Sequence, residues 1–218
     1  MCKTLIKLRN DSFDFIIKKI ADSYISINKQ RIFIQKSTVP IYTLKKLYSR
    51  IKELLNPKIE VDNIDEFIRK NYLLLNIPEF LAEGSAINNL LQPDRVIIGA
   101  LLNNDGINNN EYANYSVNVM KKFFNKWVPE DKIIDLDSNS SEIVKLLSNA
   151  FLAQRISSIN SLTEFCELTN SNINKSILKI LKLVSVAVGK DSRIGSNYLK
   201  ASMGFGGSCL KKVSKIFI

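Results

Sequence analysis

The run Tyr72-Leu73-Leu74-Leu75, which continues as Asn76-Ile77-Pro78-Glu79, decides the fold of this 218-residue chain. Four apolar residues in a row, without polar alternation, are typical of a strand that is buried on both faces of a sheet. Pro78 lacks the N–H that a sheet ladder needs, and it therefore marks the end of the strand. The stretch predicts one buried strand of a parallel sheet.

Shorter strand-like runs alternate with helical patterns on both sides of this strand. The strand-like runs cover residues 31–35, 95–99 and 133–134, and helical spacing covers residues 11–28, 40–54 and 112–127, with a short helical stretch after Gly84. Pro40 is expected to open the second of these helices, and the Asn-rich tract 102–110 is expected to be a loop. Alternating strands and helices predict an α/β fold with a parallel sheet up to about residue 136.

The character of the sequence changes after residue 136. Neither Gly nor Pro interrupts a broad apolar face from residue 140 to about 169, and a second helix is predicted over about 174–188. Ser140 or Ser141 is expected to cap the first of these helices. A helix of this length usually buries part of its surface against a partner subunit or another domain. We expect two domains: an α/β domain over residues 1–136 and an all-helical domain over residues 137–218.

The chain has no histidine, and its 31 Lys and Arg against 21 Asp and Glu give a formal net charge of +10. The absence of histidine excludes Ser-His-Asp and Cys-His nucleophiles, His-ligated zinc and imidazole proton shuttles. Any chemistry therefore depends on Cys, Lys, Glu, Asp, Asn, Thr or bound water. A hydrophobic share of 45% excludes a fully disordered chain.

The distribution of charge and the number of cysteines indicate which binding partners and which cellular compartment suit this chain. Lysine is spread along the chain without a basic stripe that alternates with aromatics, so we expect no nucleic-acid partner, and an anionic small substrate also suits the charge. Cys2, Cys166 and Cys209 show no metal spacing, and their odd number argues against a disulfide framework. No apolar run approaches the roughly 20 residues of a membrane span. We expect a cytoplasmic protein with no metal and no membrane partner.

The stretch Gly204-Phe205-Gly206-Gly207-Ser208-Cys209 is the most informative one for chemistry. Glycines before a cysteine let the backbone approach a ligand closely and offer N–H groups to an oxyanion or a phosphate. Taken by itself, such a stretch is more often a plain loop beside a buried cysteine. It is not a dinucleotide fingerprint, because that motif needs a strand before it and a helix after it.

Seven segments in a fixed order give this stretch its context. They cover residues 37–40, 78–84, 93–96, 145–149, 151–160, 191–195 and 199–209. Together they resemble the UDP-glucose/GDP-mannose dehydrogenase family, and residues 151–160 and 199–209 resemble its animal and plant UDP-glucose 6-dehydrogenase branch. The resemblance runs from about Asp11 to Cys209. It implies a Rossmann-like domain followed by a helical domain that dimerises, and two successive NAD-dependent oxidations of UDP-glucose through a covalent thioester.

The resemblance implies catalytic roles for five residues. Cys209 matches the family's nucleophile, which adds to the aldehyde and forms a thiohemiacetal that loses a second hydride. Lys145 matches the lysine that stabilises the developing oxyanion, and Asn149 lies one helical turn later on the same face. Glu79 matches the carboxylate of proton transfer and thioester hydrolysis, and Thr38 matches a residue that positions a catalytic water. By residue type alone, Lys145 and Asn149 also fit a solvated helix face, and Glu79 also fits a helix cap.

The resemblance also implies two sets of binding residues. The implied contacts of the sugar nucleotide are Glu79, Phe80, Leu81, Ala82, Glu83, Lys145, Asn149, Arg193, Lys200, Ala201, Ser202, Met203, Gly204, Phe205 and Gly206. The implied contacts of NAD are Ser37, Thr38, Val39, Glu83, Cys209 and Lys212. In the family, the arginine at the position of Arg193 contacts the substrate of a neighbouring subunit.

The chain departs from the family pattern at both ends. No GxGxxG turn precedes Arg31 and only nine residues follow Cys209, so we expect a truncated Rossmann-like sheet in a partial chain that forms no NADH by itself. Ile77 stands where the family has asparagine, and Val213 follows Lys212 where the family has aspartate. Two hypotheses remain: an NAD-dependent UDP-glucose 6-dehydrogenase, or a non-catalytic remnant that at most oligomerises through its long helix.

Overall fold

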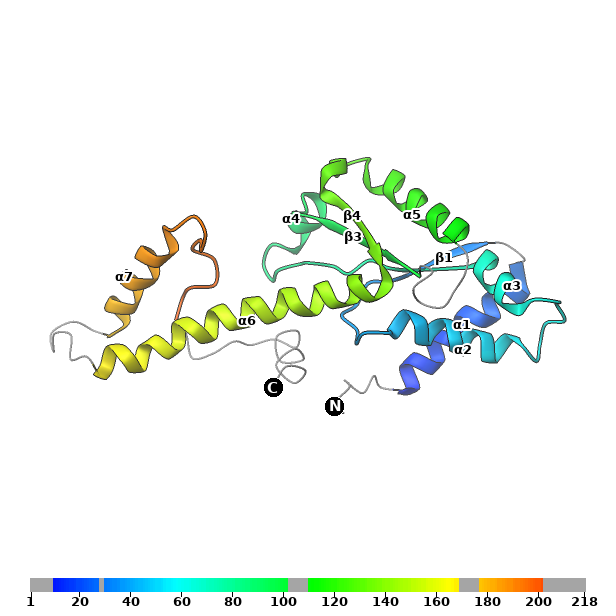
Figure 1. Cartoon of the computed structure of the whole chain (residues 1–218), viewed down its shortest axis with the longest axis horizontal. Helices are drawn as coiled ribbons and strands as arrows, with labels where there is room; N and C mark the ends of the chain where they lie inside the picture. The colour runs from blue at the N-terminus through cyan, green and yellow to red at the C-terminus, as the bar shows by residue number, and fades with distance from the viewer. Residues whose placement is uncertain (1–9, 28–29, 102–109, 169–176, 202–218) are drawn as a thin grey trace. The chain divides into compact units, whose positions relative to one another are not determined.

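Four strands form one sheet in the order β1-β2-β3-β4 (Figure 1). The computed structural model describes residues 10–27, 30–101, 110–168 and 177–201. The strands are β1 (Arg31–Gln35), β2 (Tyr72–Asn76), β3 (Val96–Ala100) and β4 (Ile133–Asp137). Of the described residues, 10–145 form one compact unit and 146–201 form another. The whole sheet lies in the first unit.

The sheet is mostly parallel. β1 pairs with β2 in parallel, with Arg31 opposite Tyr72, and β3 pairs with β4 in parallel, with Val96 opposite Ile133. β2 and β3 run antiparallel, with Leu75 opposite Ala100. Their connection, residues 77–95, contains the six-residue helix α4 (Ala86–Leu91). The predicted α/β class is confirmed, and the antiparallel pair is a feature that the alternation of elements did not predict.

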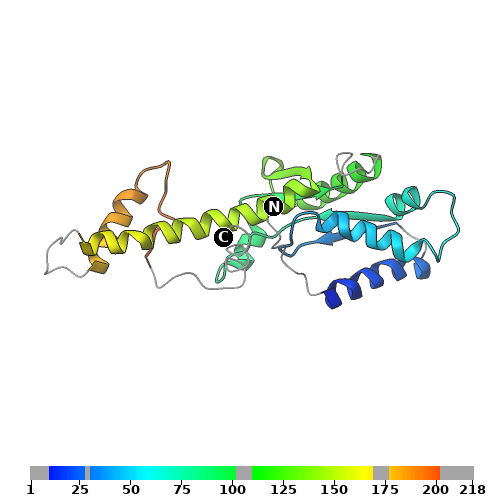
Figure 2. The same cartoon turned by 60° about the horizontal axis from the view of Figure 1, so that its bottom comes forward.

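Helices cover both faces of this sheet. α1 (Asn10–Ile27) and α2 (Thr43–Leu55) lie side by side on one face with α3 (Ile64–Asn71), and α5 (Asn110–Phe124) covers the other face (Figures 1 and 2). Tyr72 and Leu74 pack into the core under α1, α2 and α3, whereas Leu75 packs into the core under α5. Successive strand residues point to opposite faces, and all five residues of β2 are buried, as its apolar run predicted.

α3 is a helix that the sequence analysis missed. Its N-cap is Asn63, whose Oδ1 accepts a hydrogen bond from the Glu66 N–H at 3.1 Å. Ile64, Phe67 and Ile68 then contact the core at helical spacing. An Asn followed three residues later by a Glu is a helix-start signature, so the signal was present in the sequence.

The second unit is helical. α6 (Ser138–Leu168) is a 31-residue helix that follows β4 directly, and α7 (Ile177–Gly189) follows it along the chain. In the second unit, the Arg155 guanidinium donates to the carbonyl oxygens of Ile194 at 2.7 Å and Gly195 at 2.6 Å. This ties α6 to the turn that follows α7. Within the described residues, no helix is both long and apolar enough to cross a membrane.

The start of α6 differs from the prediction. Asp137 caps the helix, because its Oδ1 accepts from the Ser140 N–H at 2.9 Å and its Oδ2 accepts from the Ser140 hydroxyl at 2.5 Å. Burial raises the pKa of Asp137, but the hydrogen bonds from Ser140 and from the backbone outweigh it and the net pKa is lowered. The prediction that Ser140 or Ser141 caps the helix was wrong, because the strand passes into the helix two residues earlier than expected.

Candidate active site

The loops that follow β1 and β2 leave the sheet at the same edge, since the two strands are parallel. Lys36 follows β1 directly, and Glu79 follows β2 after Ile77 and Pro78. The Lys36 Nζ lies 3.3 Å from the Glu79 Oε2, and the two side chains remain 47% and 42% exposed. An ion pair this exposed contributes at most about 1 kcal/mol. The Glu79 carboxylate is therefore open to a ligand.

The Phe80 ring brings two cations to the same edge. The Arg95 Cζ lies 4.2 Å from the ring centroid, and the Lys145 Nζ lies 4.8 Å from it. Both distances are within the range of a cation–π attraction. Lys145 comes from the second turn of α6, far along the chain from Phe80. The fold thus brings the predicted oxyanion lysine to the residue that follows the predicted carboxylate Glu79.

A small hollow lies beside these groups. Its volume is about 60 Å³, and its lining includes Lys36, Glu79, Phe80, Asp94, Arg95 and Phe124. This volume accommodates roughly four water molecules, since each needs some 15 Å³ of this measure. The hollow offers two carboxylates, Glu79 and Asp94, and two cations, Lys36 and Arg95, to a ligand bound at this edge of the sheet.

The loop between β1 and α2 holds the first predicted NAD contacts. Ser37 is exposed, Thr38 is half-buried and Val39 is buried. α2 begins at Thr43, and the Thr43 hydroxyl donates to the Pro40 carbonyl oxygen at 2.6 Å. The prediction that Pro40 opens this helix was wrong, because Tyr42 takes a left-handed conformation (φ 69°) and separates Pro40 from the first turn.

Buried polar contacts attach the start of α6 to the sheet. The Asn76 Nδ2 donates to the Ser141 Oγ at 3.0 Å, and the Ser141 Oγ donates to the Ser138 carbonyl oxygen at 2.9 Å. Gly99 of β3 lies so close to Ser141 that an added Cβ would overlap the serine side chain. The Asn76 Oδ1 is buried and has no hydrogen-bond partner among the described residues. These contacts fix the helix that carries Lys145.

Asn149 lies one turn beyond Lys145 on the same helix. Its side chain is buried, and its Nδ2 has no hydrogen-bond partner in the part of the chain that the structure describes. A buried amide N–H without an acceptor is costly, at about 1–3 kcal/mol. Asn149 therefore offers a donor that a ligand oxygen can satisfy.

The segment after Glu79 is mostly exposed. Phe80 is half-buried, whereas Leu81, Ala82 and Glu83 are exposed. The Ala82 N–H donates to the Asn89 Oδ1 at 3.0 Å, which ties the segment to α4. The Ala82 carbonyl oxygen accepts a hydrogen bond from the Ser85 N–H at 3.2 Å.

The predicted binding residues of the second unit are described only up to Ala201. Arg193 is exposed and donates to Asp191 through Nε at 3.1 Å and through Nη2 at 2.7 Å. These bonds lower the pKa of Asp191 and raise the pKa of Arg193. Lys200 is exposed and Ala201 is half-buried. Outside the described residues lie Ser202, Met203, Gly204, Phe205, Gly206, Cys209 and Lys212.

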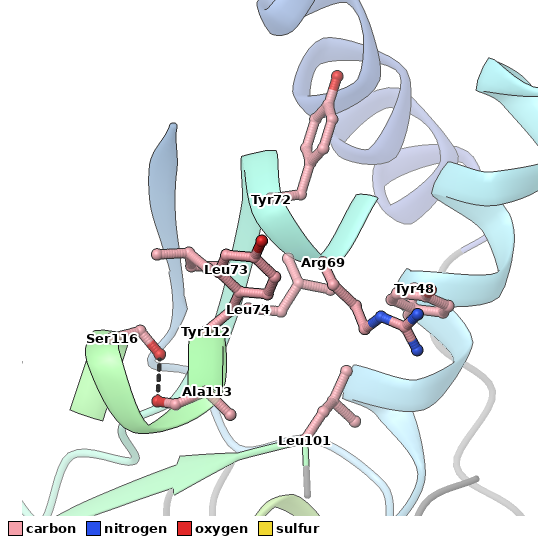
Figure 3. A pocket seen from close by; sticks show the side chains of 9 residues that line it. All are labelled: Tyr48, Arg69, Tyr72, Leu73, Leu74, Leu101, Tyr112, Ala113 and Ser116. Atoms are coloured by element: carbon pink, nitrogen blue, oxygen red, sulfur yellow. Dashed lines mark hydrogen bonds between the residues drawn. The ribbon is translucent and has the colours of Figure 1, made fainter. Parts of the chain in front are cut away.

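A second hollow lies away from these residues, between α2, α3, α5 and β2 (Figure 3). Its volume is about 30 Å³, enough for roughly two water molecules. The Arg69 side chain extends toward the Tyr48 ring, and the Arg69 Nε has no hydrogen-bond partner among the described residues. None of the predicted site residues lines this hollow. Its size excludes a sugar nucleotide.

Three residues of the site region were missed by sequence reasoning. Arg95 contacts the Phe80 ring, Asn76 binds Ser141, and Glu142 accepts from the backbone of α2. Arg95 lies in the motif at residues 93–96, although no role was assigned to it. Glu142 also had a sequence signal, since it lies three residues before Lys145 and shares its helix face. Its partner lies 98 residues away, which no local pattern encodes. Among the described residues, no three Cys, Asp or Glu side chains cluster as metal ligands.

A mostly parallel sheet with polar residues after the carboxyl ends of β1 and β2, followed by a long helix, defines a Rossmann-like protein with a helical domain. Residues 11–127 match the NAD binding domain of the UDP-glucose/GDP-mannose dehydrogenase family, and residues 139–218 match its central domain. The chain belongs to the UDP-glucose/GDP-mannose dehydrogenase family.

Two curated proteins and one solved structure are also similar to this chain. The chain is 43% identical over 182 residues to UDP-glucose 6-dehydrogenase 3 of Oryza sativa subsp. japonica, covering 84% of this chain and 32% of that protein. It is 41% identical over 182 residues to the UDP-glucose 6-dehydrogenase of Drosophila melanogaster, covering 84% and 33%. A UDP-glucose dehydrogenase structure from Pyrobaculum islandicum matches with a TM-score of 0.64 at 28% identity, covering 95% of this chain and 40% of that one. The chain thus spans about a third of the length of the curated relatives it matches. The resemblance inferred from the motifs is confirmed.

Proposed function

We propose that these residues belong to a UDP-glucose 6-dehydrogenase, which oxidises the C6 alcohol of UDP-glucose to a carboxylate with two molecules of NAD. The observation that carries the proposal is the meeting of Glu79, Phe80 and Lys145 beyond the carboxyl ends of β1 and β2. A carboxylate and an ammonium at one edge supply a proton acceptor and an oxyanion stabiliser.

The proposed reaction has three stages. The alcohol loses a proton and a hydride and becomes an aldehyde, and the Cys209 sulfur then adds to the aldehyde carbon. The resulting thiohemiacetal loses a second hydride to give a thioester, which water hydrolyses to the carboxylate and the free thiol. Lys145 stabilises the oxyanion in each stage, and Glu79 accepts protons from the alcohol and from water. Thr38 positions that water.

Asn149 and the binding residues complete the proposed site. The unpartnered Asn149 Nδ2 supports a hydrogen bond to a substrate oxygen. The exposed segment after Glu79 supports contact with the sugar by Phe80, Leu81, Ala82 and Glu83. The remaining proposed contacts are Lys200, Ala201, Ser202, Met203, Gly204, Phe205 and Gly206, with Arg193 contacting the substrate of a neighbouring subunit. An exposed guanidinium fork suits a phosphate.

The loop after β1 fits the nicotinamide end of NAD better than its phosphates. Ser37, Thr38 and Val39 lie at the carboxyl edge, where dinucleotide-binding sheets hold their ligand. The first two amides of α2 already bind the Glu142 carboxylate and are closed to a phosphate. Two NAD molecules, bound one after the other, would each accept one hydride, and Glu83, Cys209 and Lys212 are proposed to complete the NAD contacts.

A chimera tests whether these residues support the reaction. Residues 11–209 replace the matching segment of the Drosophila enzyme, and NADH formation from UDP-glucose is followed by absorbance. We expect NADH formation, and we expect Glu79→Gln to slow it by about 100-fold or more, as loss of a general base does. Glu60→Gln, at an exposed carboxylate away from the sheet edge, is the matched control and should leave the rate unchanged. A folded chimera that binds UDP-glucose and forms no NADH would contradict the proposal.

Exposed apolar side chains favour a second candidate function, self-association through the helical unit. Phe151 and Phe165 of α6 are each 62% exposed, and Leu183 of α7 is 59% exposed. Apolar side chains gathered on helices are typical of interfaces. Sedimentation equilibrium should therefore show a homo-oligomer that Phe151→Asp dissociates and that Phe123→Asp, in the other unit, leaves intact. A monomeric wild-type chain would contradict this candidate.

We further infer a domain division between residues 136 and 137, a cytoplasmic location and no nucleic-acid partner. The two family matches leave residues 128–138 between them, which supports the division. Salt-sensitive binding to DNA would overturn the last inference.

A further inference from the structure

Glu142 is a buried carboxylate that no proposed catalytic step uses. Only 1% of its surface is exposed. Its Oε1 accepts a hydrogen bond from the Leu44 N–H at 2.9 Å, and its Oε2 accepts one from the Thr43 N–H at 3.3 Å. Burying a charged carboxylate is costly unless donors satisfy it. The N–H groups of Thr43 and Leu44 in α2 supply these donors, although they lie 99 and 98 residues away in the sequence.

The amides of Thr43 and Leu44 are the first two of α2, and such groups have no partner within their own helix. The N-cap residue Tyr42 gives no side-chain hydrogen bond. Tyr42 instead adopts the left-handed conformation that turns both N–H groups toward one point, a geometry that binds anions. Glu142 supplies the anion, and the helix dipole adds to the attraction.

This contact joins the two elements that carry the proposed chemistry. Glu142 lies three residues before Lys145 on one face of α6, and α2 begins directly after the loop that holds Thr38. We propose, on the basis of the proposed function, that Glu142 is a positioning residue that sets the Lys145 ammonium and the Thr38 loop relative to each other.

Glu142→Gln tests the proposal in the purified chain, with Glu53→Gln as the matched control because Glu53 is an exposed carboxylate on α2. We expect hydrogen exchange at the Thr43 and Leu44 amides to accelerate about tenfold in Glu142→Gln, since a charge-assisted hydrogen bond is lost. Acetylation of Lys145, measured by mass spectrometry, should accelerate about threefold as the ammonium leaves the Phe80 ring. Acetylation of Lys126, which also lies over a phenylalanine ring, should stay constant.

A uniform rise in the acetylation of Lys145 and Lys126 would indicate general destabilisation and would overturn the proposal, as would no change at Thr43 and Leu44. Glu142→Asp keeps the charge and gives a second variant if Glu142→Gln does not fold. We expect Glu142→Asp to accelerate Lys145 acetylation with Lys126 unchanged, and less than Glu142→Gln does where both fold. In the chimera, Glu142→Gln should lower kcat about 10- to 100-fold and change the KM for UDP-glucose less than about twofold. A chimera without NADH would refute the proposed function, whereas exchange and acetylation test Glu142 independently.

Discussion

Asp137 is the last residue of β4, and its side chain caps the N-terminus of α6. Replacing it by alanine removes the acceptor of the Ser140 N–H and should lower the free energy of unfolding by about 1 kcal/mol, the usual contribution of an N-cap. Asp137→Asn keeps an acceptor and should recover most of this loss. Urea unfolding measures both, and an effect of Asp137→Ala no larger than that of the exposed control Asp62→Ala would contradict the capping role.

Asp65 makes stability depend on pH. The hydrogen bond from Lys52 lowers the pKa of Asp65, burial opposes this, and the hydrogen bond from the Tyr48 hydroxyl lowers the pKa further. A lowered folded-state pKa stabilises the fold above the unfolded value, about 3.9, and this contribution disappears as the pH falls through the folded value.

Asp65→Asn should therefore cost about 0.5–1 kcal/mol at pH 7, because both partners are more than a third exposed and solvent screens the pair. At pH 3 the difference from wild type should shrink. Urea unfolding at the two pH values measures it, and a difference that grows on acidification would contradict the assignment.

At the scale of elements, β3 and α6 meet at Gly99 and Ser141. Gly99→Ala places a methyl group on the Ser141 side chain and 3.3 Å from the Asn76 carbonyl oxygen. We expect a loss of about 1–3 kcal/mol in the free energy of unfolding, as is typical of overpacking. Ser141→Gly in the same chain should restore part of it. A double-mutant cycle measures the coupling, and a coupling near zero would show that the helix does not pack on this strand.

The elements themselves were largely predictable, and their junctions were not. β2 was predicted because its apolar run is a local pattern, and α3 was predictable from Asn63 and Glu66 but was missed. The antiparallel pairing of β2 and β3 joins two segments whose relative direction no local pattern encodes. The two N–H groups that follow the left-handed Tyr42 bind Glu142, which lies far away in the sequence. Local periodicity carries no information about such contacts.

At the scale of the whole molecule, some residues of the candidate site could be predicted from the sequence and others could not. The order of the motifs along the chain is enough to indicate Glu79 and Lys145, and the fold brings both to the edge that carries Phe80. Arg95 lies in the motif at residues 93–96, but its contact with the Phe80 ring was not predicted, because that contact joins two segments that are separate in the sequence. Residues joined by tertiary packing alone were therefore outside the reach of sequence patterns.

The proposed thioester route fixes the number of NADH molecules formed per UDP-glucose. In the chimera that carries residues 11–209, we expect two NADH per UDP-glucose consumed, because the alcohol becomes a carboxylate. Cys209→Ser removes the sulfur that forms the thiohemiacetal, and it should therefore give at most one. Two NADH per UDP-glucose from Cys209→Ser at the wild-type rate would contradict the account.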